Sequence, residues 1–459
     1  MGMRNQQRRA AKAKRRARRR VDGPPPAGGW SPPPGGWSPP PGAPAAPTPP
    51  DSEEIAILLF GAVHAHLTGD SSAVRATAAM LAGERPGAVD TVVQTALSRM
   101  VREAWTGGWL PYDLHQTALR QLDAVAAGYV VDAIAAEAQQ YAAATVHQRW
   151  ADQLRQIDAT VWWQPGASHL AQWAEHQRLG RTEALVTVIE VLGMLSSLPV
   201  LPRILPLPGS APVGAARPSR RGVDQKVLSR VRALLSKAES TGFPEEAEAL
   251  SAKAQELMSR YALEHAVLDA EQGTDPEPAT ARRLWLDNPY VGAKALLVNA
   301  VASANRCRTM LYEKIGFITV LGDEVDLEIV EVLTTSLLVQ ATKAMLAGGS
   351  RVSRTGQSRT RSYRQSFLVS YATRIGERLS TATEEAMTGG CGDAAVDTDR
   401  LLPVLAARER VVDDLFETMF PHTVQRSVSV SNAEGWYAGR AAADLAVLDT
   451  HRPLDARTG

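Results

Sequence analysis

Arginine and lysine form the clearest chemical pattern in this sequence. Residues 1–20 contain ten Lys or Arg side chains and no acidic residue. The members of this basic arm taken as candidate contacts are Arg8, Arg9, Lys12, Lys14, Arg15, Arg16, Arg18, Arg19 and Arg20. Such cations neutralise phosphate groups and release counterions, which requires no defined fold. A nucleic-acid backbone is therefore the first partner that the sequence indicates.

A second basic segment lies in the C-terminal half of the chain, at residues 351–376. It contains six arginines and no acidic residue. Its first part is rich in Ser, Thr and Gly and has no apolar period, which predicts an exposed loop. From Tyr363 onward, apolar residues recur at helical spacing and predict a helix. We take Arg359, Arg361 and Arg364 as further candidate phosphate contacts.

The remainder of the chain is acidic. The whole sequence has a net charge of +1, from 50 basic and 49 acidic side chains. Because the arm holds ten basic groups and no acid, the rest of the chain carries 40 basic against 49 acidic groups, a net of −9. An acidic body with a basic arm favours an anionic partner. The arm could instead dock on the acidic body or only increase solubility.

Two tryptophans occupy equivalent places in a Pro-rich tandem repeat. The sequence GGWSPPP occurs at 28–34 and again at 35–41, which includes Trp30 and Trp37. This stretch cannot bury a core, so we expect residues 1–50 to be disordered or locally polyproline II. The repeats are typical of a semi-rigid linker, and they could also bind a protein. A protein-interaction module using these repeats and helical surfaces is our second hypothesis.

Histidine and cysteine provide no complete catalytic or metal site. His169 and His176 are seven residues apart and could align on a helix, but no cysteine or acidic cluster completes a zinc site. The sequence has no HExxH, GxSxG, phosphate-loop or dinucleotide-binding glycine pattern. Cys307 could be a nucleophile, but a buried structural thiol explains it better. We assign no catalytic residue, metal or cofactor, and an enzyme with scattered site residues is the third hypothesis.

Helix-terminus electrostatics explains the acidic clusters. Glu245, Glu246 and Glu248 stand at the start of a predicted helix, where the positive end of the helix dipole favours carboxylates. Asp323 precedes a long predicted helix, and its carboxylate can accept the free N–H groups there. The three glutamates could also be metal ligands or general bases, and the GDE sequence at 322–324 could form a metal or phosphate site. Dipole and capping effects explain both groups without a ligand.

Cysteine content and hydropathy favour a soluble protein of the reducing cytoplasm. Cys307 and Cys391 are far apart and form no disulfide framework. The most apolar stretch, residues 185–209, is interrupted by Glu190, an arginine and several prolines. We find no continuous apolar span of 18 residues, so we expect no membrane partner.

The first folded region, residues 51–195, has helical patterns throughout and predicts a helical bundle. Segment 52–67 begins with acidic residues, as a helix N-terminus prefers, and a second helix is predicted over 87–105. We expect one long Ala-rich helix after Pro111 and another over 168–195. A linker rich in Pro, Gly and Arg follows at 196–222.

Residues 223–268 predict an antiparallel αα-hairpin. Two amphipathic segments flank a Gly-Phe-Pro break, in which Gly242 can end the first helix and Pro244 can begin the second. Because each segment has one apolar stripe, the two stripes must face each other.

The hairpin sequence ALLSKAESTGFPEEAEALSAKAQELM, residues 233–258, resembles a bacterial and phage family called domain of unknown function 2786. Similar proteins often continue into an α+β domain, and VLGDEVDLEIVEVL, SYRQSFLVSYATRIGERL and GWYAGRAAADL look like parts of it. GGWLPYDLHQ, residues 107–116, looks like segments found upstream in such proteins. The resemblance implies this fold over about 224–447, and it implies no activity, ligand or site residue.

The last region, residues 280–450, predicts a small α+β domain. Segments 307–312 and 317–322 flank a turn and predict a β-hairpin, with a short strand at 426–430. Helices are predicted over 290–304, from Asp323 to about 346, from Tyr363, near 400–420 and over 434–447. The expected fold class is mostly α: an N-terminal helical bundle, the αα-hairpin and the α+β domain, preceded by a disordered basic and Pro-rich segment.

Overall fold

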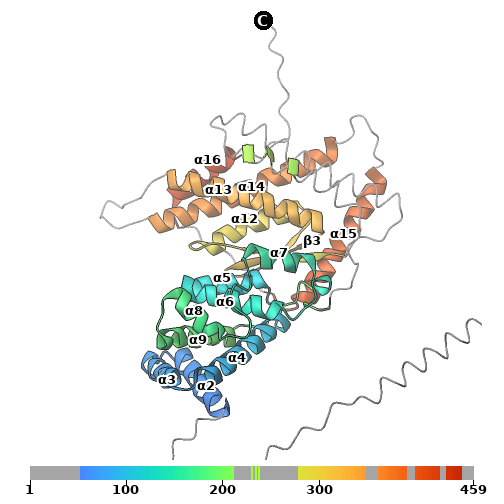
Figure 1. Cartoon of the computed structure of the whole chain (residues 1–459). Coiled ribbons are helices and arrows are strands. Elements are labelled where there is room, and N and C mark those ends of the chain that lie inside the picture. The colour runs from blue at the N-terminus through green and yellow to red at the C-terminus, as the bar shows by residue number, and fades with distance from the viewer. Residues whose placement is uncertain are drawn as a thin grey trace, which may run out of the picture. The chain divides into compact units, whose positions relative to one another are not determined.

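The computed structural model describes the chain in several stretches (Figure 1). They are residues 52–210, 229–230, 233–234, 236–237, 278–347, 360–389, 398–423 and 431–446. The basic arm, the tandem repeat, most of the predicted hairpin, Arg359, Cys391 and the predicted strand at 426–430 lie outside the described residues. The described helices and strands fall within one compact unit, Pro50–Gly459. The mostly helical fold with a small antiparallel sheet in its C-terminal half is as predicted.

The N-terminal half is a bundle of helices, as the apolar periodicity predicted. The helices are α2 (Ser52–Leu67), α3 (Ser71–Gly83), α4 (Pro86–Thr106), α5 (Pro111–Gln121), α6 (Ala124–Ala138), α7 (Gln148–Gln156), α8 (His169–Gln177) and α9 (Arg181–Ser196). α2 and α4 agree closely with two predicted segments. α9 lies at the centre of the bundle, and Leu185, Val188 and Ile189 on it are fully buried. α3 and α7 were not predicted.

Two predicted helices are wrong in the same way, because each is two helices. The helix expected after Pro111 breaks before Asp123, whose Oδ1 accepts the N–H of Ala126 at 2.7 Å and so caps α6. The helix expected over 168–195 breaks at Arg178, which ends α8 in the left-handed conformation with φ 58°. Apolar periodicity does not register such breaks, because both halves keep one face towards the core.

The start of the predicted linker packs onto the bundle. Leu201 and Leu205 are buried in the core of the bundle. The N–H of Leu201 donates to the carbonyl of Gly107 at 2.8 Å. Gly108 must be glycine, because its φ is +83° and an added Cβ would lie 2.2 Å from the carbonyl oxygen of Leu201. The predicted linker at 196–222 therefore begins as an ordered strap, and its second part lies outside the described residues.

The C-terminal half is built on a three-stranded antiparallel sheet. Its order is β1 (Thr280–Trp285), β3 (Phe317–Gly322), β2 (Arg308–Tyr312). The β2–β3 pair confirms the predicted hairpin, whereas β1 was not predicted. β1 pairs in register with β3 from Thr280 opposite Gly322 to Trp285 opposite Phe317.

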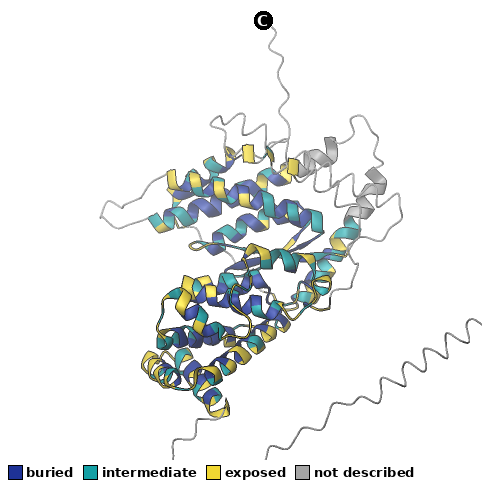
Figure 2. Cartoon of the chain, viewed as in Figure 1, coloured by how far each residue is buried: buried dark blue, intermediate teal, exposed yellow. Residues whose placement is uncertain are grey.

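Helices cover both faces of the sheet. The helices are α12 (Val291–Ala304), α13 (Glu324–Ala347), α14 (Thr360–Gly389), α15 (Thr398–Met419) and α16 (Ala433–Asp444). The central strand β3 is buried along its whole length, in keeping with its place between two layers (Figure 2). Ile318 and Val320 on one face pack in the core with α12, α13 and α14. Phe317 and Leu321 on the other face pack with the bundle and with α15, respectively, as the two-residue period of a strand requires.

α14 and α16 pack closely through two glycines of α16. An added Cβ at Gly435 would lie 2.3 Å from the carbonyl oxygen of Tyr363, and one at Gly439 would lie 2.1 Å from that of Phe367. Two sequence segments that resemble the family, SYRQSFLVSYATRIGERL and GWYAGRAAADL, are therefore direct packing partners. Asn432 caps α16 by accepting the N–H of Gly435 at 2.8 Å.

α13 is the one helix in the described part of the chain that is long and apolar enough to cross a membrane, by length and composition alone. Charged residues interrupt the apolar sequence in the first turns of α13, so the sequence pattern did not predict a membrane span there. Leu327, Val330 and Leu337 on this helix pack in the core beside the sheet. A core helix of this kind passes the same length and hydropathy test. At its start, Asp323 Oδ1 accepts the N–H of Val325 at 3.0 Å, which confirms the predicted cap.

Candidate nucleic-acid interface

The start of α14 holds the candidate phosphate contacts that the structure describes. α14 begins at Thr360, so Arg361 lies on a helix and not in the predicted loop, and Arg364 lies on the helix as predicted. The boundary was misplaced by three residues, because Thr360, Arg361 and Ser362 precede the first apolar residue of the stripe. Arg361 is exposed and Arg364 is half-buried. Their spacing of three residues places both side chains on neighbouring positions of one helix face.

These two arginines have no acceptor among the described residues. Neither side chain makes a hydrogen bond or ion pair there, and the buried Nε of Arg364 is also unpaired. The first turn of a helix is the positive end of its dipole, so cations at this position gain nothing from the helix itself. The described residues therefore leave this positive charge uncompensated.

Other arginines are fixed between the bundle and the sheet. Arg283 on β1 pairs with Asp113 on α5, and both side chains are only 3% exposed. Its guanidinium also donates to the carbonyl oxygens of Gly108 and Pro202, each at 2.9 Å. The other carboxylate oxygen of Asp113 accepts the indole N–H of Trp285 at 2.8 Å. This buried pair joins the two halves of the fold, because the Nη atoms of Arg283 bond to three segments, whereas its buried Nε has no hydrogen-bond partner.

Two further arginines of the bundle reach the sheet. Arg120 on α5 donates to the carbonyl of Leu286 at 2.8 Å and lies over the ring of Trp285, with 4.8 Å from its Cζ to the ring centroid. Arg149 on α7 donates to the carbonyl of Ala281 at 2.9 Å and lies 3.5 Å from a carboxylate oxygen of Glu324. We call Arg120, Arg149 and Arg283 the inter-half arginines.

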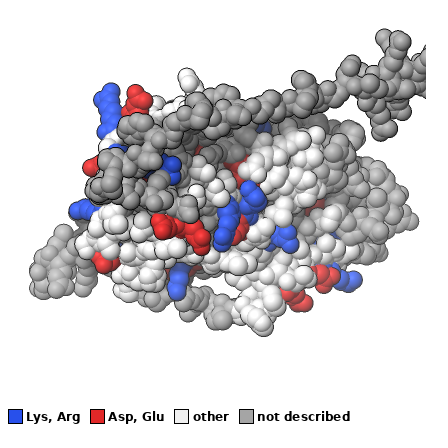
Figure 3. Space-filling view, turned by 60° about the horizontal axis from the view of Figure 1, so that its bottom comes forward, with Lys and Arg blue, Asp and Glu red and all other residues white. Residues whose placement is uncertain are grey.

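The described surface has no obvious division by charge. On the face in Figure 3, acidic and basic side chains are interspersed among uncharged ones. Several half-buried arginines of this part of the chain have carboxylate partners, such as Arg374 and Arg440 with Glu377. Among the described residues, Arg361 and Arg364 at the start of α14 have no such partner, as is also the case for Arg75 and Arg85 of the bundle.

A cluster of aromatic side chains beside α8 was not found from the sequence. Asp132 on α6 is 7% exposed, and its two oxygens contact Trp162 Nε1 and His169 Nε2, each at 2.9 Å. The ring centroid of Trp163 lies 4.1 Å from that of His169, and that of Trp162 lies 4.9 Å from that of His176. The predicted alignment of the two histidines is confirmed, because the ring of Trp162 lies beside both. The adjacent tryptophans in the sequence VWWQPG were the available signal.

Cys307 is a structural thiol, as expected. It is 3% exposed, and its Sγ lies 3.3 Å from the carbonyl oxygen of Asn305. Burial raises the pKa of this thiol well above its usual value, which keeps the nucleophilic thiolate scarce. Among the described residues, no group of three or more His, Cys, Asp or Glu side chains is placed to bind a metal ion.

The family comparison agrees with the resemblance seen in the sequence. Residues 226–265 match the family described as Protein of unknown function (DUF2786). The matched DUF2786 segment includes the Gly-Phe-Pro break of the predicted hairpin and covers a small part of the chain. No curated protein and no solved structure matches the chain.

The four other segments that resembled DUF2786 proteins meet in the described fold. VLGDEVDLEIVEVL forms the end of β3 and the first turns of α13, and the two segments on α14 and α16 pack against each other through glycine. GGWLPYDLHQ supplies Gly108 and Asp113, which bind Arg283 of the sheet. The segments therefore occupy contacts that hold the fold together, and none of these contacts identifies a reaction.

Proposed function

We propose that this protein associates with nucleic acid through two basic segments, the arm at residues 1–20 and the start of α14. The proposal assigns no reaction. The buried free thiol of Cys307 supports a reducing compartment, so the proposed location is the cytoplasm. The proposed ligand group is the phosphate backbone, because both segments are rich in arginine and neither carries an acid.

The observation that carries the proposal is the uncompensated charge at the start of α14. The inter-half arginines each have protein acceptors, and Arg283 has three. Arg361 and Arg364 have none among the described residues. Guanidinium groups bind phosphate through paired N–H donors, and an anion beside a helix N-terminus also gains from the helix dipole. One phosphate group could therefore satisfy both the side chains and the end of the helix.

The two segments would contribute in different ways. The arm carries ten positive charges and can follow any backbone without reading sequence. The arginines of α14 stand on a helix, so they present fewer charges in fixed positions. We expect the arm to supply most of the affinity and α14 to supply a smaller contribution that depends on the form of the nucleic acid.

Fluorescence anisotropy with labelled single-stranded and duplex DNA tests this proposal at about 50 mM salt, where phosphate contacts are strong. Deletion of residues 1–20 should weaken binding strongly. Replacement of Arg359, Arg361 and Arg364 by alanine should weaken it less. A matched control replaces three exposed arginines of the bundle, Arg75, Arg85 and Arg99, and removes the same charge.

The control separates local contacts from net charge. If the bundle variant loses as much affinity as the α14 variant, the effect comes from overall charge and the start of α14 is not a contact. If the full-length protein binds no DNA or RNA at this salt concentration, the nucleic-acid proposal fails.

An exposed apolar face favours a protein partner as the second candidate function. On α2, the side chains of Ile57, Phe60 and Leu67 are 66%, 40% and 51% exposed and recur on one side of the helix. Gly61 stands beside them, and an added Cβ there would meet nothing within 4 Å. A glycine in a helix interior costs roughly 0.5–1 kcal/mol relative to alanine, and contacts within the described chain do not require it.

Sedimentation of the purified protein tests the simplest partner for this face, a second copy. A concentration-dependent dimer that Phe60→Glu abolishes would support the protein-interaction function. A wild-type monomer with the same sedimentation coefficient as the variant would contradict self-association through α2.

A further inference from the structure

Trp162 combines wide exposure with a fixed orientation. Its side chain is 44% exposed. Its indole N–H nevertheless donates to the nearly buried carboxylate of Asp132 at 2.9 Å. The same carboxylate is held from its other side by His169. A tryptophan that served only the core would be buried, and one without a role at the surface would not require a buried anchor. The bond sets the direction of the ring while leaving much of it in solvent.

The loop that carries Trp162 is pinned at two more points. The side-chain amide of Gln172 on α8 accepts the backbone N–H of Gln164 at 2.9 Å and donates to the backbone carbonyl of the same residue at 3.3 Å. Ser168 caps α8 by accepting the N–H of Ala171 at 3.0 Å, and its hydroxyl donates to Asp90. Asp90 is in turn 3.0 Å from Arg181. The aromatic surface is therefore built in advance of any ligand.

A catalytic role for the His169–Asp132 pair has no support from its surroundings. A carboxylate that orients an imidazole is the geometry of a general base, which needs a nucleophile or substrate proton within hydrogen-bond reach. The nearest hydroxyl in sequence, Ser168, points to Asp90 instead. The ring of His169 is also stacked on Tyr129, with 5.2 Å between centroids and 13° between planes. The pair supports the aromatic cluster.

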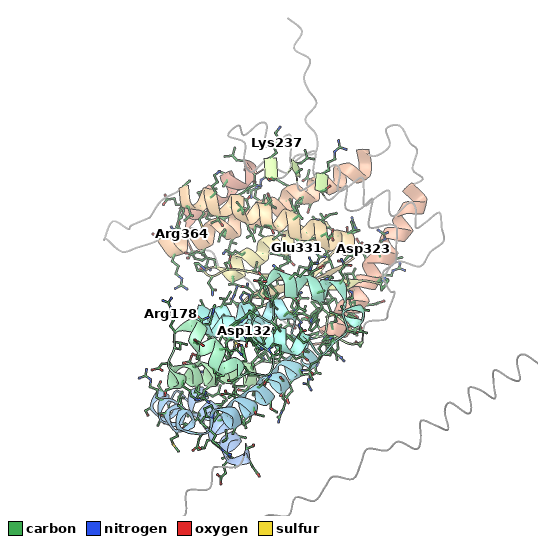
Figure 4. All side chains as sticks on the ribbon, in the orientation of Figure 1. Asp132, Arg178, Lys237, Asp323, Glu331 and Arg364 are labelled. Carbon is green, nitrogen blue, oxygen red and sulfur yellow. The ribbon has the colours of Figure 1, made fainter. Side chains whose placement is uncertain are left out.

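The groups beside Trp162 suit a base attached to phosphate. The rings of Trp162 and Trp163 meet in a T-shaped contact, at 85°, and the ring of His176 lies beside Trp162, with 4.9 Å between centroids and 38° between planes. The exposed side chains of His176 and Arg178 lie at the end of α8 and can donate to phosphate or base edges. Figure 4 shows Arg178 and Arg364, from the start of α14, on the same side of the molecule.

We infer that Trp162 is a stacking platform for one unpaired base of a single-stranded nucleic acid. The inference rests on the proposed function and deepens it by naming the form of nucleic acid. Proteins that bind single strands combine cations that follow the backbone with aromatic rings on which bases stack. A duplex keeps its bases stacked on each other, so it cannot use such a ring in the same way.

Binding of a mixed-sequence single strand and of its duplex to the full-length protein tests the inference. Trp162→Ala should weaken single-strand binding roughly 5- to 150-fold, the range for loss of one base–aromatic stack. Its affinity for the duplex and the salt dependence of single-strand binding should stay unchanged, because stacking releases no counterion. Trp162→Phe keeps a ring and should retain most of the affinity. Tyr437→Ala removes another aromatic, 72% exposed, and serves as the matched control.

The outcomes distinguish this inference from the proposed function. If Trp162→Ala binds single strands as tightly as the wild type, the platform is refuted while nucleic-acid association stands. If Trp162→Ala weakens single-strand and duplex binding equally, or if Tyr437→Ala weakens single-strand binding as much as Trp162→Ala does, base stacking at this ring is also refuted. If the wild type binds neither form, both the platform and the proposed function fail. Circular dichroism of each variant confirms that the fold is retained.

Discussion

Arginines in two regions of this protein have opposite surroundings. Between the bundle and the sheet, Arg283 meets a buried carboxylate and two backbone carbonyls. At the start of α14, Arg361 and Arg364 meet no acceptor in the described part of the chain. Arginine content alone therefore does not indicate a ligand site. An arginine whose acceptors come from the chain supports the fold, and one without acceptors is available to a partner.

The largest expected effect is the loss of the buried pair. Arg283→Met leaves the carboxylate of Asp113 buried without its cation, which should cost about 3–5 kcal/mol of unfolding free energy. Urea denaturation followed by circular dichroism measures the loss. Arg99→Met, in an exposed pair with Glu103, should cost at most about 1 kcal/mol. Equal losses in the two variants would remove the distinction between buried inter-half arginines and surface arginines.

Displacement of Arg120 from its contact with the sheet should cause a smaller loss of unfolding free energy. Gly316 has a φ of +100°, and an added Cβ would lie 1.8 Å from Nη1 of Arg120. Gly316→Ala should therefore cost about 1–2 kcal/mol, because the backbone conformation disfavours alanine and the arginine must move. Gly61→Ala, in a helix interior with open space, should instead gain about 0.5–1 kcal/mol. Melting temperatures that shift in the same direction for both variants would contradict this account.

Lowering the pH should reduce the unfolding free energy through His115, which lies on α5 near the same contact. Burial lowers the pKa of this imidazole, and its Nδ1 is buried without a hydrogen-bond partner. Because the folded-state pKa lies below the unfolded value of about 6.5, the unfolded chain binds the proton more readily. Stability should be full above that value and fall as the pH is lowered through the folded-state pKa. His115→Gln should make the unfolding midpoint less sensitive to pH between about 7 and 5.

The smallest expected effect on stability is at the start of α14. Arg361→Ala combined with Arg364→Ala should change the unfolding free energy by no more than about 0.5 kcal/mol, as for surface substitutions that break no contact. Thermal unfolding of this double variant checks the value. A loss as large as that of Arg283→Met would show that these arginines support the fold, and the contrast between the two regions would collapse.

The sequence predicted the elements whose pattern is local. α2, α4, α12 and the β2–β3 hairpin follow from apolar periodicity, and Asp323 was recognised as a cap. β1 was missed because TARRLW lacks a clear alternation of apolar and polar residues. Its two arginines, Arg282 and Arg283, pair with Glu324 and Asp113, which are distant in sequence. The breaks at Asp123 and Arg178 were missed because apolar faces continue across them.

The candidate site was only partly accessible from the sequence. The basic segments are visible as composition, but whether an arginine has an acceptor depends on tertiary contacts. Arg149 and Arg283 looked no different from Arg361 before the fold brought carbonyl and carboxylate groups to them. The anchoring of Trp162 by Asp132 joins residues 30 positions apart and carries no local signature.

The salt dependence of nucleic-acid affinity tests whether the arginines at the start of α14 contact phosphate. Binding of the full-length protein to duplex DNA would be compared with that of the variant lacking the positive charges of Arg359, Arg361 and Arg364. Each lost phosphate contact should reduce the slope of log affinity against log salt by about 0.9, so three contacts predict a reduction of roughly 2.7. The account predicts this flatter slope in the α14 variant and an unchanged slope in Arg99→Ala. An identical slope in wild type and α14 variant, or no binding at about 50 mM salt, would contradict it.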